Sequence, residues 1–327
     1  MISAALAKEL EEYLKVIDSA IGEAIDSYPW GVPKLKEAVR YSLEGGKRLR
    51  SIILLSVYDE LSSASEASEP VVGQSGLPDP SNLSRPPGYW DGPMAFAVAL
   101  EMIQAYSLVH DDLPCMDDDD YRRGRLSCHK KFGEATALLC GDALLTMAFE
   151  CMVSCKGIPH EQVLRAALAI ARAAGPSGMV GGQLLDLLFE GQTEVPGIPD
   201  MYRMKTGALF RCSAMAGAIL AGASTNVVEL CGTWGELFGY AYQIIDDIED
   251  SGAGGKEQDK NTLLKTMSLS EACMEAKQSL TKSIEAASAV FPGQVLIKEL
   301  SGIYLSRLED LEHSEGLEHS NSNDGRR

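Results

Sequence analysis

Apolar side chains recur every three or four positions along most of the chain, and this spacing predicts amphipathic α-helices. Two stripes illustrate the pattern: Leu6, Leu10, Leu14 and Ile17, and then Val163, Ala166, Ala167, Ile170 and Ala171. No alternating runs of β-branched residues bounded by turn pairs stand out, so we expect no strands. The pattern therefore predicts a single all-α domain with long central helices.

Two segments interrupt the helical pattern. Residues 62–91 are rich in Ser, Pro and Gly, and we interpret them as a mobile surface insertion. Residues 313–327 are polar, and we expect them to form a disordered tail. Neither segment separates two independently patterned halves, so the predicted domain spans residues 1–312.

The charge balance excludes several classes of partner. The 327 residues include 47 acidic and 29 basic side chains, which gives a net charge of −18. This sign argues against nucleic acid and anionic membranes, because both attract Lys and Arg. We also expect no stable membrane insertion and no leader, since no apolar stretch of spanning length lacks a charge. The apolar run Cys212–Ser224 is short and is typical of a buried helix.

The eight cysteines indicate a reducing compartment. They lack zinc-finger spacing, and a chain of this length can build a core without disulfides. We therefore expect reduced thiols and a cytoplasmic protein. Cys151 and Cys155 are four residues apart and would be neighbours on a helix; we interpret them as core or interface thiols.

A first acidic cluster follows the apolar run Met94–Val109, and six of the ten residues from 111 to 120 are Asp. A helix would therefore deliver Asp111 and Asp112 at its carboxyl end, where the helix dipole disfavours negative charge. Pro114 disturbs the helix and can bring Asp117 back beside Asp111. We expect a cation to compensate the cluster.

A second acidic cluster ends another apolar helix. Asp246 and Asp250 are separated by four residues and share a helix face, with Asp247 adjacent. Carboxylates on a mostly buried helix are costly unless they are paired or bind a metal. This cluster also predicts a cation.

Basic residues indicate the kind of ligand that would bind together with the cation. A glycine pair precedes Lys47, Arg48 and Arg50, and further cations occur at Arg122, Arg123 and Lys205. Arginine forks match phosphate oxygens, and Mg²⁺ binds carboxylates together with phosphates. The combination predicts a diphosphate held between Mg²⁺ and basic side chains. Each motif alone fits a simpler interpretation: a solvated acidic loop, a weak calcium site, a solvated helix face or an exposed turn.

Taken together, these motifs resemble the short-chain trans-isoprenyl diphosphate synthases, the farnesyl and geranylgeranyl diphosphate synthase family, and most closely its bacterial-type farnesyl members. The resemblance extends from about residue 4 to residue 311. It rests on DDLPCMDDDDYRRG, DDIED, GGKRLR, KTG, GDALL, HKKFGEATALL and GGQLLDL, in the family's order.

The resemblance implies a fold and a metal. The fold would be a bundle of long antiparallel helices around a central cavity, the isoprenoid synthase fold, as a homodimer. Three Mg²⁺ ions, with Mn²⁺ as an alternative, would bind the allylic diphosphate. Their ligands would be Asp111, Asp117 and Asp246, supported by Asp112, Asp247 and Asp250.

The resemblance also implies substrates and reaction steps. Residues matching allylic diphosphate ligands are Arg122, Lys205 and Lys260, and those matching isopentenyl diphosphate ligands are Lys47, Arg50, Gln104 and Arg123. The Thr206 hydroxyl, the Lys205 carbonyl and the Gln243 side chain would stabilise an allylic cation. Asp111 and Asp246 would take part through magnesium.

Product length is predicted from the residues one helical turn before Asp111. These are Tyr106 and Ser107, and the aromatic ring at position 106 is large enough to close a tunnel for the growing chain. Relatives with Tyr followed by Ser at these positions generally stop at fifteen carbons. The simpler alternative is a packed Tyr with no gating role.

The sequence departs from the family pattern at three points. Ser51 replaces the usual Pro, Lys256 and Lys260 are only four residues apart, and Thr262-Leu263-Leu264 replaces Thr-Tyr-Pro. The leading interpretation is a farnesyl diphosphate synthase. A geranylgeranyl diphosphate synthase, a non-catalytic regulatory subunit and a terpene cyclase are the alternatives.

Overall fold

The computed structural model describes residues 4–66, 91–189, 197–252, 262–293 and 295–314. They divide into two compact units, described separately below. The N-terminal unit comprises residues 4–169 and 215–224, and the C-terminal unit comprises residues 170–214 and 225–327 with residues 1–3. Helices dominate both units, which confirms the all-α prediction. The single domain over residues 1–312 stays a prediction.

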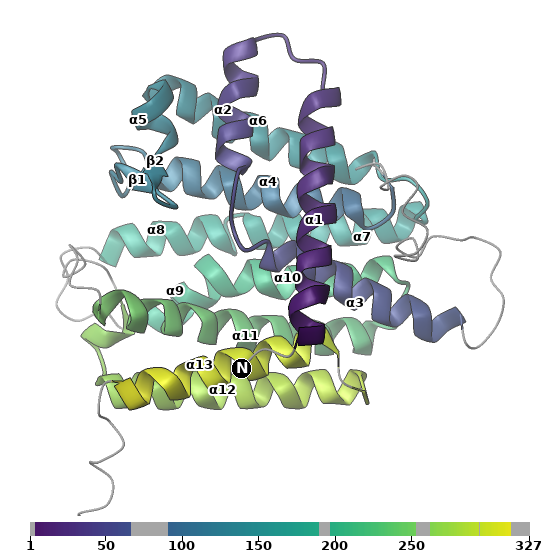
Figure 1. Ribbon diagram of the computed structural model, residues 1–327, viewed down its shortest axis with the longest axis vertical. Helices are drawn as coiled ribbons and strands as arrows, with labels where there is room; N and C mark the ends of the chain where they lie inside the picture. The colour runs from purple at the N-terminus through teal and green to yellow at the C-terminus, as the bar shows by residue number, and fades with distance from the viewer. Residues whose placement is uncertain (1–3, 67–90, 190–196, 253–261, 294, 315–327) are drawn as a thin grey trace, which may run out of the picture. The chain divides into compact units, whose positions relative to one another are not determined.

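The N-terminal unit is built around one buried helix. Its helices are α1 (Ala4–Ser27), α2 (Pro33–Leu43), α3 (Leu49–Glu66), α4 (Met94–Asp111), α5 (Cys128–Phe132), α6 (Glu134–Val153) and the first part of α7 (His160–Ala174). Apolar residues occupy most positions of α4, so it is buried on nearly every side. It packs against α6, α3, α1 and α2, as Figure 1 shows for α4 and α6. This packing holds the carboxyl end of α4, and the aspartates there, in a defined place.

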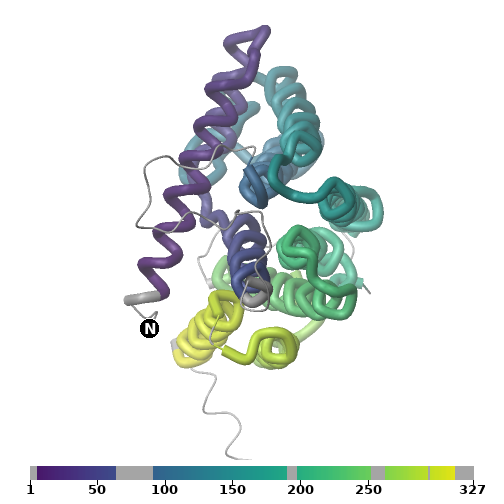
Figure 2. Tube along the Cα trace, turned by 90° about the vertical axis from the view of Figure 1, so that its right-hand side faces the viewer, coloured from purple at the N-terminus to yellow at the C-terminus, as the bar shows by residue number. Residues whose placement is uncertain are grey.

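The C-terminal unit is organised around the longest helix in the described chain, α11 (Thr225–Gly252). The other elements are α8 (Met179–Phe189), α9 (Ile198–Tyr202), the π-helical turn η2 (Arg203–Gly207), α10 (Ala208–Leu220, whose last residues lie in the N-terminal unit), the 3₁₀ turn η4 (Leu263–Lys265), α12 (Leu269–Val290) and α13 (Leu296–Ser314). Figure 2 shows α11, α12 and α13 packed side by side. Trp234 stacks on Phe238, which also contacts Phe210, and these rings form the aromatic centre of the unit.

The structure corrects the expectation of no strands. Two short strands, β1 (Tyr121–Arg122) and β2 (Arg125–Leu126), pair as an antiparallel hairpin. They escaped the sequence analysis because two-residue strands are too short to show alternation.

Two segment boundaries also differ from the prediction. Helix α3 continues to Glu66, so the first residues of the expected insertion 62–91 are helical, and α13 includes His313 and Ser314 of the expected tail. The remaining residues 67–90 and 315–327 lie outside the described part. Cys151 and Cys155 are both buried, as expected for core thiols, but they are not neighbours on one helix because α6 ends at Val153. The Cys155 thiol instead contacts the Gly92 carbonyl at 3.2 Å.

One described helix, α6, has the length and apolar composition that would permit a membrane crossing. The inner face of α6 packs on α4, and 44% of its apolar window is buried within the fold. The opposite face of α6 exposes Leu138, Leu139, Phe149 and Val153.

Candidate active site

The first aspartate motif folds as predicted at the end of α4. The helix ends at Asp111, and Asp112 follows as its C-cap. The Asp117 backbone N–H donates to the Asp111 carbonyl at 2.9 Å, and Met116 N–H donates to the Leu113 carbonyl at 2.8 Å. The chain therefore turns back after Pro114 and brings Asp117 beside Asp111, which a regular helix would separate by nearly two turns.

Asp112 has an arginine partner. It is almost fully buried, and its Oδ1 accepts from Arg122 Nε at 2.8 Å and from Arg122 Nη2 at 2.6 Å. Arg122 also donates to Asp119 at 2.9 Å. Burial raises the pKa of Asp112, and the Arg122 guanidinium opposes that rise. Asp112, predicted to support the metal ions, is thus hydrogen-bonded to Arg122, predicted to bind the allylic diphosphate.

Arg123 occupies the tip of the β1–β2 hairpin. It has φ 53° and Gly124 has φ 73°, as a two-residue type I′ turn requires. A non-glycine residue in this left-handed region is strained by about 1–2 kcal/mol. Strain of this kind tends to persist where a side chain must be aimed at a particular point.

The Arg123 side chain is aimed at the glycine pair between α2 and α3. Its Nη1 donates to the Gly45 carbonyl at 2.8 Å and to the Glu44 carbonyl at 3.2 Å. A Cβ on Gly46 would lie 2.9 Å from the Arg123 Cζ, so the close approach requires glycine there. The GGKR and RRG motifs therefore form one contact, although Gly45 and Arg123 are 78 residues apart in the chain.

Positive charge gathers at this contact. Burial, followed by repulsion from Arg48, Arg122 and Arg50, lowers the pKa of Arg123, while Glu101 opposes the shift. Such a cluster favours an anion. A small cavity of about 40 Å³ lies beside it, and its lining includes Ser42, Asp112, Arg122, Arg123 and Cys128.

Arg48 does not contribute its charge to an external ligand. It is buried and donates to Glu101 Oε2 at 3.0 Å, to Asp18 Oδ1 at 3.0 Å and to the Leu43 carbonyl at 2.6 Å. The Ser51 hydroxyl lies 2.7 Å from Glu101 Oε1 and 2.8 Å from the Ala97 carbonyl oxygen, so either can accept its single hydrogen. The departure at Ser51 is therefore part of a buried polar network. Glu101 was not identified from the sequence, because it is a single acid within the apolar run that forms α4.

The remaining predicted residues of this unit differ in their exposure to solvent. Lys47 is exposed, Arg50 and Gln104 are partly buried, and Ser107 is buried with its hydroxyl on the Gln104 carbonyl. Tyr106 is buried, and burial followed by the nearby Asp111 carboxylate raises its pKa to about 12.

His110 anchors α4 to α6. Its ring is T-shaped against Tyr106, with centroids 5.8 Å apart, and its Nε2 lies 3.0 Å from the Leu138 carbonyl. Gly141 has no Cβ to collide with this ring, which explains the glycine of the GDALL motif.

The C-terminal unit carries the second set of predicted residues. Thr206 donates to Gln243 Oε1 at 2.7 Å, and Gln243 Nε2 donates to Asp247 Oδ1 at 2.9 Å. The Tyr202 hydroxyl also donates to Asp247 and accepts from Leu263 N–H at 2.9 Å. Thr206, Gln243 and Asp247 thus form one chain of hydrogen bonds, which Tyr202, missed from the sequence, extends to η4.

Lys205 lies in the π-helical turn η2, a type of turn that is frequent at functional sites. Its Nζ donates to Asp186 at 2.6 Å, and its backbone packs so closely on Gly182 that a Cβ there would clash. The neighbouring Gln183 is buried, and neither amide atom has a hydrogen-bond partner among the described residues. Asp186 and Gln183 both belong to the GGQLLDL segment and were not singled out from the sequence.

The DDIED motif lies near the carboxyl end of α11. Asp246 is partly buried and Asp250 is exposed. Asp246 lies near enough to Tyr304 to help burial raise the pKa of that phenol to about 12. Glu249 is paired with Arg307, so it serves the packing of α13. Lys260 and Lys256 lie outside the described residues.

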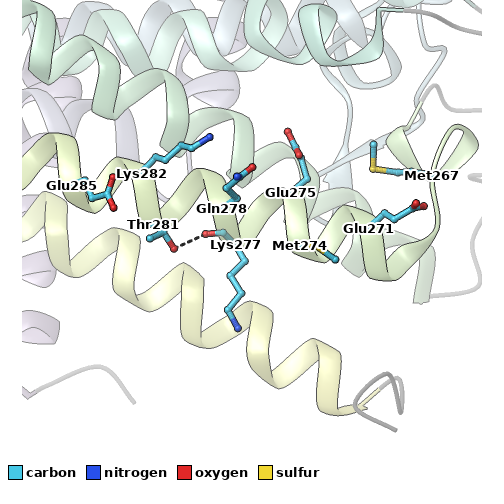
Figure 3. A pocket seen from close by; sticks show the side chains of 9 residues that line it. All are labelled: Met267, Glu271, Met274, Glu275, Lys277, Gln278, Thr281, Lys282 and Glu285. Atoms are coloured by element: carbon cyan, nitrogen blue, oxygen red, sulfur yellow. Dashed lines mark hydrogen bonds between the residues drawn. The ribbon is translucent and has the colours of Figure 1, made fainter. Parts of the chain in front are cut away.

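A much larger cavity, with a volume of about 710 Å³, is lined by none of these residues. Its lining consists of Met267 and eight residues of α12 between Glu271 and Glu285. Figure 3 shows mixed charged and neutral side chains spread along this helix. No predicted site residue lines it, and oppositely charged side chains along one helix do not favour a diphosphate.

Comparisons with known proteins agree with this geometry. The family model described as Polyprenyl synthetase matches residues 32–289. A farnesyl diphosphate synthase of Geobacillus stearothermophilus is 38% identical over 290 residues, which cover 85% of this chain and 88% of that protein. A geranylgeranyl diphosphate synthase of Cyanophora paradoxa is 35% identical over 246 residues, 74% and 73% of the two chains. The crystal structure of an FPP/GFPP synthase from Zymomonas mobilis superposes with a TM-score of 0.76 at 30% identity, covering 94% and 100%.

Proposed function

Since the chain belongs to the polyprenyl synthetase family and is a prenyltransferase, we propose that it makes farnesyl diphosphate. Isopentenyl diphosphate would be condensed with dimethylallyl diphosphate and then with geranyl diphosphate. The observation that carries the proposal is the occurrence, in one compact unit, of the Asp111–Asp117 turn and the arginine cluster around Arg123.

Magnesium fits the donor set. Asp111 and Asp117 offer hard carboxylate oxygens, and a hydrogen bond joins their backbones. In the C-terminal unit Asp246 and Asp250 offer the same chemistry on one helix face. When bound, Mg²⁺ would neutralise charge on the departing diphosphate. Asp112 and Asp247 are assigned a supporting role beside these ligands, and each is held by a side chain of its own unit, Arg122 and Gln243 respectively.

The basic residues have separate tasks in this proposal. Arg123, Lys47 and Arg50 hold the diphosphate of isopentenyl diphosphate, assisted by Gln104. Arg122 and Lys205 stabilise the allylic diphosphate, each oriented by a carboxylate, Asp112 and Asp186 respectively. Lys260 is assigned to the same diphosphate on the motif alone.

Thr206 and Gln243 are suited to an allylic cation. The Thr206 hydroxyl hydrogen points to Gln243, which leaves the oxygen lone pairs of Thr206 for a positive centre. Asp247 orients the Gln243 amide from the other side. An apolar surrounding is needed because water would quench the cation.

The assembly and location are also proposed. Helix α6 exposes Leu138, Leu139, Phe149 and Val153, which are spaced along one face, and we assign this face to a homodimer. All eight cysteines are free thiols, which supports a cytoplasmic location.

The direct test is incubation of the purified protein with isopentenyl and dimethylallyl diphosphates and Mg²⁺, with product length read by chromatography. We expect a fifteen-carbon product. A twenty-carbon product would identify a geranylgeranyl diphosphate synthase, a cyclised hydrocarbon a terpene cyclase, and inactivity of the protein alone a regulatory subunit.

A variant links the activity to the first aspartate motif. Asp111→Ala should lower turnover by about a hundredfold or more while the circular dichroism spectrum is retained, because metal-assisted charge stabilisation is lost. Asp26→Ala, an exposed aspartate of α1 paired with Lys36, is the matched control. Unchanged turnover of Asp111→Ala would reject the site.

A further inference from the structure

Three side chains form a mixed cluster that the diphosphate chemistry leaves unassigned. They are Asp118 and Asp120, from the loop after α4, and His129 of α5. One ligand atom from each lies within 4.8 Å of the others. All three belong to the N-terminal unit.

His129 is the unusual member of the cluster. Its side chain is only 3% exposed, and its Nε2 has no hydrogen-bond partner among the described residues. This atom points toward the carboxylates, 3.9 Å from Asp118 Oδ1. A buried nitrogen directed at two carboxylates without a hydrogen bond calls for a ligand.

Ser127 determines which nitrogen of the imidazole is available. Its hydroxyl lies 3.0 Å from His129 Nδ1. When Nδ1–H donates to this oxygen, the Nε2 lone pair faces the carboxylates. Metal-binding histidines are commonly held in this way, with the other ring nitrogen donating to a fixed acceptor.

The position already attracts positive charge. Lys130 Nζ lies 2.7 Å from Asp120 Oδ1 and 3.9 Å from Asp118 Oδ1. The Lys130 side chain is 38% exposed, and both carboxylate side chains are 60% exposed. A small cation arriving from solvent can therefore displace the ammonium group without disturbing the core.

We propose that Asp118, Asp120 and His129 bind a divalent first-row transition-metal ion, such as Mn²⁺ or Zn²⁺. One imidazole nitrogen with two carboxylates suits such ions, whereas Mg²⁺ prefers oxygen ligands alone. The site is separate from Asp111 and Asp117. A bound ion would tie α5 to the loop that carries the first aspartate motif.

Nitrogen coordination distinguishes this site from the magnesium sites. Mn²⁺ added in the presence of excess Mg²⁺ should show ¹⁴N modulation in electron spin-echo experiments, and ¹⁵N-histidine labelling should change its frequencies. The modulation should disappear in His129→Leu. It should persist in His110→Asn, which removes the imidazole beside Asp111. Absence of histidine modulation in the unaltered protein would overturn the proposal.

Exposed variants test the site without risk to folding. Asp120→Asn should weaken Mn²⁺ binding about tenfold or more, as loss of a metal-site group does. Lys130→Gln should strengthen it about fivefold, because the competing ammonium is gone. Equal Mn²⁺ affinities in the unaltered protein and both variants would show that Lys130 alone neutralises the cluster, and would overturn the proposal.

Discussion

We propose that a growing hydrocarbon chain meets α4 at Tyr106. Its ring is buried one turn before Asp111 and leans on His110. Tyr106→Ala opens this space, so we expect the product to shift from fifteen toward twenty carbons. Chromatography of the reaction products measures the shift.

Tyr106→Phe keeps the ring and should retain the fifteen-carbon product, which separates ring size from the hydroxyl group. A Tyr106→Ala enzyme that still stops at fifteen carbons would mean that the ring is a packing residue only.

Substitutions of Arg123 can separate its backbone strain from its role in binding isopentenyl diphosphate. Arg123→Gly and Arg123→Ala both remove the guanidinium, and both should raise KM for isopentenyl diphosphate by about tenfold or more, the loss of a charge-assisted contact. Only glycine suits φ 53°, so Arg123→Gly should be more stable than Arg123→Ala by about 1 kcal/mol. Urea denaturation and steady-state kinetics provide the two measurements. Equal stability of the two variants would contradict the type I′ turn.

At the scale of elements, α1 and α3 meet through a partly buried acid. The Tyr13 hydroxyl donates to Asp59 at 2.8 Å. Burial, with repulsion from Glu60 and Glu9, raises the pKa of Asp59 to about 7 although the Tyr13 hydrogen bond opposes the rise. The folded protein therefore binds a proton that the unfolded chain has already released above pH of about 4.

A pH dependence of stability follows from that contact. The free energy of unfolding should fall by about 2 kcal/mol, after allowance for solvent screening, as pH rises from about 4 to 7 and folded Asp59 loses its proton. Above pH of about 7 it should level off. Asp59→Asn should remove this part of the slope, as urea denaturation across the pH range can measure. A slope that persists unchanged in Asp59→Asn would assign it to other groups.

Prediction from the sequence succeeded where local patterns decide the structure. The helix that ends at Asp111, the turn after Pro114 and the placement of the DDIED motif on a helix follow from period, proline and charge, and the structure confirms them. Failures occurred where partners are distant in the chain. Glu101 pairs with Arg48, 53 residues away, and no periodicity reveals that contact.

Among the site residues, too, local motifs could be identified from the sequence, whereas contacts between distant residues could not. The motifs identified Thr206 and Gln243, but the hydrogen bond between them joins η2 to α11 and depends on tertiary packing. Asp186 escaped notice because one acid on an apolar helix resembles an ordinary surface residue. Its role became visible only through Lys205.

At the scale of the whole molecule, the exposed apolar face of α6 needs a partner. Leu139 is 58% exposed and Val153 is 62% exposed, while the opposite face of the helix packs on α4. Apolar side chains gathered along one helix face are costly in water and are typical of protein interfaces. A second copy of the chain offers the same face, so a two-fold symmetric contact satisfies both.

The proposed homodimer predicts the mass of the protein in solution. In detergent-free buffer the protein should sediment at twice its chain mass of 35.2 kDa. Leu139→Glu places a charge on the exposed face and should yield monomers, because an unpaired carboxylate resists burial. Met274→Glu, which alters a comparably exposed apolar residue on α12, should leave the dimer intact. A monomeric unaltered protein that binds vesicles through α6 would instead assign the face to lipid.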